Sequence, residues 1–192
     1  MNLEGALTWA FEFEDQPYFA GFRSLASNGI DKPVLNVFRV FSKLPGRRIV
    51  VTSDSALPLD DILKNGVRSR PDVGALAALE SGKLCVLLWH YHDDDVPGTS
   101  ATVQLEFFGL PFAEGKATLQ HYRIDEDRSN AFAAWKRMGS PPQPTAGQRT
   151  QLEAKGRLAT SSSPGTVVVE NASATVQIHL PRQAVSLLEL TW

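Results

Sequence analysis

The sequence predicts a mainly β protein, an antiparallel β-sandwich with two short helices, which follows an amino-terminal strand and helix of different character. Between residues 31 and 44, apolar side chains recur at the spacing of a helix. From residue 45 onward, short runs with period-two alternation dominate, and two helical stretches interrupt them at about 130–157. We therefore expect two domains, residues 1–44 and residues 45–192.

The first expected element is a strand over residues 3–11, apolar almost throughout, as in a parallel strand that is covered on both faces. It leads into a loop with many carboxylates and aromatic rings, in which Trp9 offers a flat ring and Glu12, Glu14 and Asp15 are candidate acceptors for the hydroxyl groups of a ligand. An indole ring offers a flat apolar surface and carboxylates accept hydrogen bonds from hydroxyl groups, which together suit a sugar. The alternative is that Trp9 belongs to the core and the acidic residues form a solvated loop.

A helix is expected from about residue 31 to residue 44. Asp31 is suited to the N-cap, Pro33 to the first turn, and Pro45-Gly46 to the end of the helix. Its apolar residues define a face that needs a partner: Val34, Val37, Phe38, Phe41 and Leu44.

The rest of the chain is predicted to form roughly eight strands joined by polar turns. The most definite feature is a hairpin of residues 73–80 and 83–92, closed around Ser81-Gly82. Residues 57–71 are expected to be a polar connection. The other strands are expected over 47–53, 102–107, 117–124, 166–170, 174–180 and 185–191, and the two helices over 130–138 and 146–155. Evenly spaced strands of this kind favour an antiparallel sandwich.

The composition is that of an ordinary globular chain, with 192 residues, a formal net charge of −2 and a pI near 6.1. This balance gives no basis for a nucleic-acid or anionic-membrane surface, and no run reaches the roughly 18 apolar residues of a membrane span. We expect no nucleic-acid partner, no membrane partner and no cofactor. The compartment stays open, with a soluble protein of the bacterial cytoplasm or periplasm as the expectation. The single cysteine, Cys85, is expected to be a small buried strand residue.

The segment Trp89-His-Tyr-His-Asp-Asp-Asp95 is a candidate metal site. His90 and His92 lie on one face of the predicted strand and carboxylates follow them, which suits zinc or another divalent ion. The spacing lacks a second pair of ligands, however. We therefore interpret the segment as an acidic turn at the end of a strand and predict no metal site.

Two groups of residues together form a recognisable pattern. The first is Trp9, Phe13-Glu-Asp15, Gly21-Phe22 and Lys32-Pro33, and the second is Gln120-His-Tyr-Arg-Ile-Asp125, Ser129-Asn130, Trp135 and Met138-Gly-Ser-Pro141. The first group resembles the last strand and helix of the catalytic barrel of glycoside hydrolase family 39, the β-xylosidase family. The second resembles the carboxy-terminal stretch of the same family. The resemblance covers nearly the whole chain.

The resemblance implies that residues 1–44 are the terminal strand–helix unit of a (β/α)8 barrel, followed by a β-sandwich domain. It implies a retaining hydrolase of xylosides or xylo-oligosaccharides, active in xylan degradation, which needs two carboxyl groups about 5 to 5.5 Å apart. In the family these glutamates come from the fourth and seventh barrel strands, the first of them in an Asn-Glu pair, and this sequence contains no such dipeptide. We therefore expect no catalytic residue in this chain and no turnover by the chain alone. Trp9, Glu14 and Asp15 are expected to form part of a sugar site.

Two kinds of partner follow from the resemblance. One is xylose or a xylo-oligosaccharide, bound as part of a complete barrel. The other is a segment that carries the missing barrel strands, or a second copy of the chain associating through residues 1–44. The alternative is a non-catalytic sandwich that binds carbohydrate or serves as a structural module. Its candidate aromatic residues are Trp89, Tyr91, Tyr122 and Trp135, of which Tyr122 and Trp135 are expected to pack between the sandwich and its helices.

Overall fold

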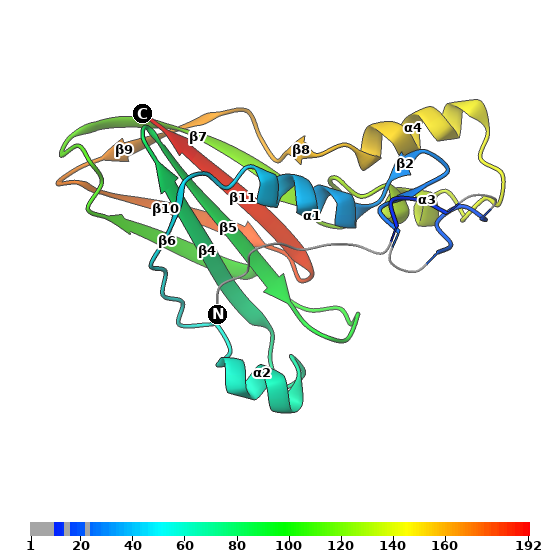
Figure 1. Ribbon diagram of the computed structural model, residues 1–192, viewed down its shortest axis with the longest axis horizontal. Helices are drawn as coiled ribbons and strands as arrows, with labels where there is room; N and C mark the ends of the chain where they lie inside the picture. The colour runs from blue at the N-terminus through cyan, green and yellow to red at the C-terminus, as the bar shows by residue number, and fades with distance from the viewer. Residues whose placement is uncertain (1–9, 14–15, 22–23) are drawn as a thin grey trace.

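The computed structural model describes residues 10–13, 16–21 and 24–192 (Figure 1). Its helices are α1 (Pro33–Ser42), α2 (Leu59–Asn65), α3 (Ala131–Arg137) and α4 (Ala146–Gly156). Its strands are β1 (Ala26–Ser27), β2 (Ile30–Asp31), β3 (Arg47–Ile49), β4 (Asp72–Glu80), β5 (Lys83–Tyr91), β6 (Ala101–Phe108), β7 (Gly115–Ile124), β8 (Ala159–Thr160), β9 (Gly165–Val169), β10 (Ser173–Leu180) and β11 (Ala184–Thr191).

Two antiparallel sheets form the body of the molecule. The larger has the order β3-β4-β5-β11-β7, with β8 and β9 both pairing with β7, and the smaller consists of β10 and β6. The predicted hairpin is β4–β5, in which Glu80 pairs with Lys83 across a two-residue turn. Gly82 has a φ of +74° in that turn, a conformation that glycine adopts without steric cost. The prediction of a mainly β, antiparallel fold is confirmed.

The core lies between the two sheets. Leu84, Val86 and Leu88 of β5 face inward, where they meet Val176 and Ile178 of β10. The smaller sheet buries one face only, since β6 alternates as predicted, with Val103, Leu105 and Phe107 packed toward this core. Burial of these alternating side chains fixes the register of the two sheets.

The central strands are apolar on their outer face as well, because α1 covers that face. Cys85 and Leu87 of β5 and Leu187 of β11 pack with Val40 of α1 in a second cluster. Figure 1 shows α1 lying across the larger sheet, with α3 and α4 beyond one end of it. This double cover explains the continuous apolar run over residues 84–88, which a half-exposed strand would interrupt with polar residues.

Several elements differ from the sequence prediction. The predicted polar connection 57–71 contains α2, a short helix with no buried residue, in which Leu59, Ile62 and Leu63 recur at helical spacing but Leu59 and Leu63 remain exposed. The predicted strand 47–53 ends at Ile49, and the two-residue strands β1, β2 and β8 were not predicted. Asp31 is not the N-cap of α1; Lys32 holds that position, and Asp31 forms an ion pair with Arg39 at 2.7 Å.

Most of the predicted strand 3–11 lies outside the described residues, although Ala10 forms a parallel bridge with Ser24. None of the described helices has the length and apolar character needed to cross a bilayer.

Candidate functional site

The predicted sugar-binding residues Trp9, Glu14 and Asp15 lie outside the described residues, so their placement stays a prediction. The backbone between them is fixed, because the Phe11 carbonyl accepts hydrogen bonds from the Leu25 and Ala26 amides, both at 2.8 Å. The loop that follows the predicted strand is therefore held against residues 24–26.

Lys32 organises the turn that follows this loop. Its ammonium donates to the carbonyls of Ala20 and Gly21 at 3.2 and 2.8 Å and to Ser24 Oγ at 2.5 Å, so each of its three N–H groups has an acceptor. Burial lowers the pKa of Lys32, and the nearby Glu12 carboxylate acts in the opposite direction. These contacts give a physical reason for a lysine at the start of the helix in the family pattern.

Glu12 has a structural role in this loop. Its Oε1 accepts a hydrogen bond from the Gly29 amide at 2.8 Å, across seventeen residues of sequence. The carboxylate thus connects the segment after the predicted strand to the β1–β2 turn. It helps to hold the segment that precedes Glu14 in the sequence.

Helix α1 has two apolar faces. Val37, Val40 and Leu44 pack on the larger sheet. Val34 and Phe41 point elsewhere and remain 41% and 46% exposed. Val34, Val37, Phe38, Phe41 and Leu44 were predicted to form one apolar face that needs a partner, whereas the sheet covers Val37 and Leu44 together with Val40, which was not predicted. The exposed face remains available for another part of a larger protein.

Asn36 anchors α1 to the α3–α4 corner. It is fully buried, and its Nδ2 donates to the carbonyls of Ser129 at 2.9 Å and Gly156 at 2.6 Å. Its Oδ1 accepts from Arg39 at 2.9 Å. Because both ends of the amide are satisfied, the helix has one specific position on the sandwich.

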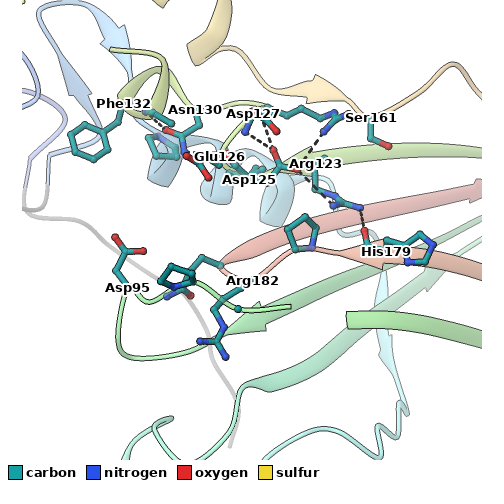
Figure 2. Close-up of a pocket in the computed structure, with 18 of the residues that line it drawn as sticks. Asp95, Arg123, Asp125, Glu126, Asp127, Asn130, Phe132, Ser161, His179 and Arg182 are labelled. Atoms are coloured by element: carbon teal, nitrogen blue, oxygen red, sulfur yellow. Dashed lines mark hydrogen bonds and ion pairs between the residues drawn. The ribbon is translucent and has the colours of Figure 1, made fainter. Parts of the chain in front are cut away.

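A hollow of about 1200 Å³ lies at one end of the sandwich, between the end of β7, the start of α3 and the turn between β10 and β11. Figure 2 shows Arg123 and Asp125 on one wall, with Arg182 opposite and pointing away from them. One wall of the hollow comes from the inward face of β7. The apolar positions Ala117 and Leu119 of this strand are followed by His121 and Arg123, and Asp125 comes directly after the strand. The sequence analysis missed this site, and the change from apolar to ionisable residues at alternate positions of a strand is the signal that could have found it.

The hydrogen bonds on this wall are specific. Arg123 Nη2 donates to the His179 carbonyl at 2.9 Å, and its Nη1 lies 3.7 Å from Asp125 Oδ2. His121 Nδ1 is 2.8 Å from Ser161 Oγ. Burial, followed by the fields of Arg123 and Arg128, lowers the pKa of His121 from 6.5 to about 4, so the imidazole is neutral at pH 7.

The two histidines of the predicted acidic turn have structural partners. His92 Nε2 is 3.0 Å from the Arg68 carbonyl and therefore carries the proton, while Nδ1 accepts from the Asp94 amide at 3.1 Å. His90 Nδ1 donates to the Leu180 carbonyl at 2.9 Å. Within the described part of the chain, no three His, Cys, Asp or Glu side chains are grouped to hold a metal ion.

Most of the candidate aromatic residues are engaged in packing. Trp135 contacts Phe19 at a centroid distance of 5.2 Å, and Lys43 lies over the Tyr122 ring at 4.5 Å. Trp89 Nε1 donates to Asp72 at 2.6 Å, whereas Tyr91 is 46% exposed. These rings do not form the exposed row that a sandwich uses to bind a sugar chain.

The second group of motif residues builds the corner beside the hollow. Asn130 caps α3 by accepting from the Ala133 amide at 3.0 Å, and Ser129 Oγ donates to the Arg123 carbonyl at 2.7 Å. Trp135 Nε1 donates to the Pro141 carbonyl at 3.0 Å. Ser129, with a φ of +55°, adopts a conformation that these bonds stabilise. These motif residues therefore determine local structure.

The described part of the chain is an antiparallel sandwich with a helix on its outer face, an architecture that by itself assigns no activity. The sequence profile of glycosyl hydrolases family 39 matches residues 4–163, and the chain belongs to this family. The predicted correspondence to a carboxy-terminal part of a family 39 enzyme is confirmed. No curated protein matches the chain.

Several solved structures of glycosidases share the fold of this chain. A family 39 enzyme from Xanthomonas axonopodis pv. citri matches with a TM-score of 0.71 and 21% identity over 91% of this chain and 33% of its own. A monomeric β-xylosidase from Caulobacter crescentus CB15 matches with a TM-score of 0.68 and 20% identity, over 95% of this chain and 36% of its own. A bacterial orthologue of human α-L-iduronidase matches with a TM-score of 0.67 and 22% identity, over 84% of this chain and 27% of its own. The chain thus spans about a third of the length of these enzymes.

Proposed function

We propose that this chain is the carboxy-terminal part of a retaining β-xylosidase-like hydrolase and that it completes a barrel whose other strands lie outside it. The observation that supports this most is the exposed apolar side of α1, where Val34 and Phe41 stay exposed although the adjacent side, with Val37 and Val40, packs on the larger sheet. The similar solved enzymes are about three times as long as this chain. We therefore expect the exposed apolar side chains of α1 to pack against the rest of the barrel.

In this proposal the chain supplies part of the sugar site and none of the catalytic carboxylates. Trp9 stacks on the apolar face of the sugar in the glycone position, and Glu14 and Asp15 accept hydrogen bonds from its hydroxyl groups. The acid/base and the nucleophile come from other strands, at the distance that retention requires. Residues 1–44 then form the terminal unit of the barrel and residues 45–192 the sandwich that supports it.

The test is hydrolysis of an aryl β-xyloside by the chain alone and by the chain combined with a segment that carries the missing barrel strands. The chain alone should give no turnover, and the combination should be active. Trp9→Ala should lower kcat/KM of the combination at least about tenfold through lost stacking, whereas Trp89→Phe, a change in the sandwich, should leave it within about twofold. Turnover by the pure chain alone would contradict the proposal.

A further inference from the structure

We propose that the hollow at the end of the sandwich binds a small oxyanion, a phosphate or a carboxylate, through Arg123 with Ser161 and Arg128. The proposal concerns residues 121–161 of the sandwich and does not depend on the proposed barrel or its sugar site. It starts from the incomplete pairing of one buried cation.

Arg123 is buried but has few partners. Its side chain is 7% exposed, and a guanidinium has five N–H donors. Among the described residues it makes one short hydrogen bond, to the His179 carbonyl at 2.9 Å, and a long contact of 3.5 Å to His121. Its Nε is buried with no partner in the described part of the chain. Buried guanidinium groups are normally paired, so this arrangement favours a further acceptor.

The nearest carboxylate does not compensate for this charge. Asp125 Oδ1 accepts from the backbone amides of Asp127 and Arg128, at 2.9 and 2.8 Å. Its Oδ2 lies 3.5 Å from Arg128 and 3.7 Å from Arg123, so a single carboxylate serves two guanidinium groups at long distance. Another acid at the hollow, Asp127, pairs with Arg137 at 2.6 Å on the exposed side. Arg123 and Arg128 therefore share the single carboxylate of Asp125, while the other acids at the hollow, Asp95 and Glu126, form no ion pair with either guanidinium group among the described residues.

The neighbouring side chains extend this wall as neutral donors. His121 Nε2 lies 3.5 Å from Arg123 Nη2 and 3.1 Å from Ser186 Oγ, so it acts as the acceptor and the ring proton resides on Nδ1. Nδ1 then donates to Ser161 Oγ at 2.8 Å, which leaves the Ser161 hydroxyl proton free for a ligand. A protonated His121 would add a third cation; burial, together with the positive charges of Arg123 and Arg128 that favour an anion, lowers the pKa of this imidazole and keeps it neutral.

The donor set selects the class of ligand. The guanidinium groups of Arg123 and Arg128 would repel a metal cation at this wall. An uncharged sugar would leave their positive charge uncompensated. An oxyanion provides two or three acceptor oxygens, which match the planar donors of Arg123 and the Ser161 hydroxyl. The hollow of about 1200 Å³ has room for such a group and its hydration shell.

The experiment is a titration of the whole chain with inorganic phosphate and, separately, acetate at constant ionic strength, followed by the NMR signals of the His121 ring. Saturable shifts are expected with at least one anion, and the one that binds more tightly identifies the oxyanion class. Binding should also raise the pKa of His121, because a bound anion offsets the field of Arg123 and Arg128. Shifts no larger than those caused by chloride would contradict the proposal.

Substitutions can distinguish a specific oxyanion site at Arg123 from general attraction of anions by surface charge. Arg123→Gln should weaken binding by about tenfold or more, in line with the loss of a charge-assisted pair, and Arg123→Lys by less. Arg137→Gln is the matched control, since Arg137 lines the same hollow but is 47% exposed and already paired; it should stay within about twofold. If Arg123→Gln does not fold, Ser161→Ala provides the test and should weaken binding severalfold. Equal losses in the Arg123 and Arg137 variants would overturn the proposal. Because no barrel segment or sugar is present, this result is independent of the proposed hydrolase function.

Discussion

The central strands of the sandwich and helix α1 both have apolar residues on two faces, but only the strands are covered on both. In β11, Leu188 faces the smaller sheet and Leu187 faces α1, and both are fully buried. In α1, Val40 is covered by the sheet while Phe41, the next residue, is 46% exposed. The central strands are thus covered on both faces by residues of this chain, whereas the described part of α1 is covered on the side that faces the sandwich and exposes Phe41.

Among the proposed substitutions, we expect the largest loss of stability inside the sandwich, where side chains are fully buried. Leu188→Ala should lower the free energy of unfolding by about 2–5 kcal/mol, because it removes a fully buried side chain and leaves a cavity between the sheets. Urea unfolding followed by circular dichroism measures this change. Leu63→Ala in α2 is the control, since Leu63 is 74% exposed, and it should change stability by less than about 0.5 kcal/mol. Similar losses in the two variants would contradict the assigned core.

The connection between the two regions is the next test. Asn36→Ala should cost about 1–3 kcal/mol, because the buried carbonyls of Ser129 and Gly156 lose their donor. Amide hydrogen exchange in α1 should become faster as the helix loosens from the sandwich. Asn65→Ala is the matched control, an exposed helical asparagine of α2 whose only side-chain bond is 3.4 Å long, and it should be nearly neutral. Unchanged exchange in Asn36→Ala would show that packing alone holds α1.

The polar wall of the sandwich predicts a pH dependence. The pKa of His121 is about 4 in the folded chain, below its ordinary 6.5, so between these values the unfolded chain binds more protons. Stability should therefore be fully present above pH 6.5 and should decrease as the pH falls toward 4. His121→Gln should reduce this slope, as measured by urea unfolding at several pH values. A variant with the wild-type slope would exclude His121 as its source.

The smallest expected effect on stability is at the exposed face of α1. Phe41→Asp should change the free energy of unfolding by less than about 1 kcal/mol, since the ring is half exposed. The same variant should abolish association with a barrel segment or with a second copy, measured by sedimentation. Phe108→Asp on β6, where the ring is 76% exposed, should leave association intact. Equal behaviour of the two variants would remove the special role of α1.

Hydrophobic periodicity in the sequence was sufficient to predict the elements whose buried side chains recur at the spacing of their secondary structure. The hairpin at Ser81-Gly82 and the one-sided strand β6 follow directly from turn chemistry and alternation. Helix α2 was not predicted, because its three apolar residues, Leu59, Ile62 and Leu63, span only about one turn in an otherwise polar segment. The two faces of α1 were also indistinguishable, since sequence spacing shows which residues are apolar but not which partner covers them.

The two candidate sites also differ in whether the sequence alone could predict them. Trp9, Glu14 and Asp15 were chosen through the family pattern, and their role stays a prediction. The oxyanion site at Arg123 depends on contacts among β7, β8 and β10, which lie far apart in the sequence. Only the folded chain brings His179 and Ser161 to the wall that β7 provides.

The most direct test of the central claim is the native mass of the chain mixed with a segment that carries the missing barrel strands of a family 39 enzyme. Sedimentation should show a one-to-one complex for the wild-type chain and no complex for Phe41→Asp. Circular dichroism should show that the wild-type chain and the variant are both folded. A wild-type chain that remains at 21.0 kDa beside a folded barrel segment would contradict the claim that its exposed helix face completes a barrel.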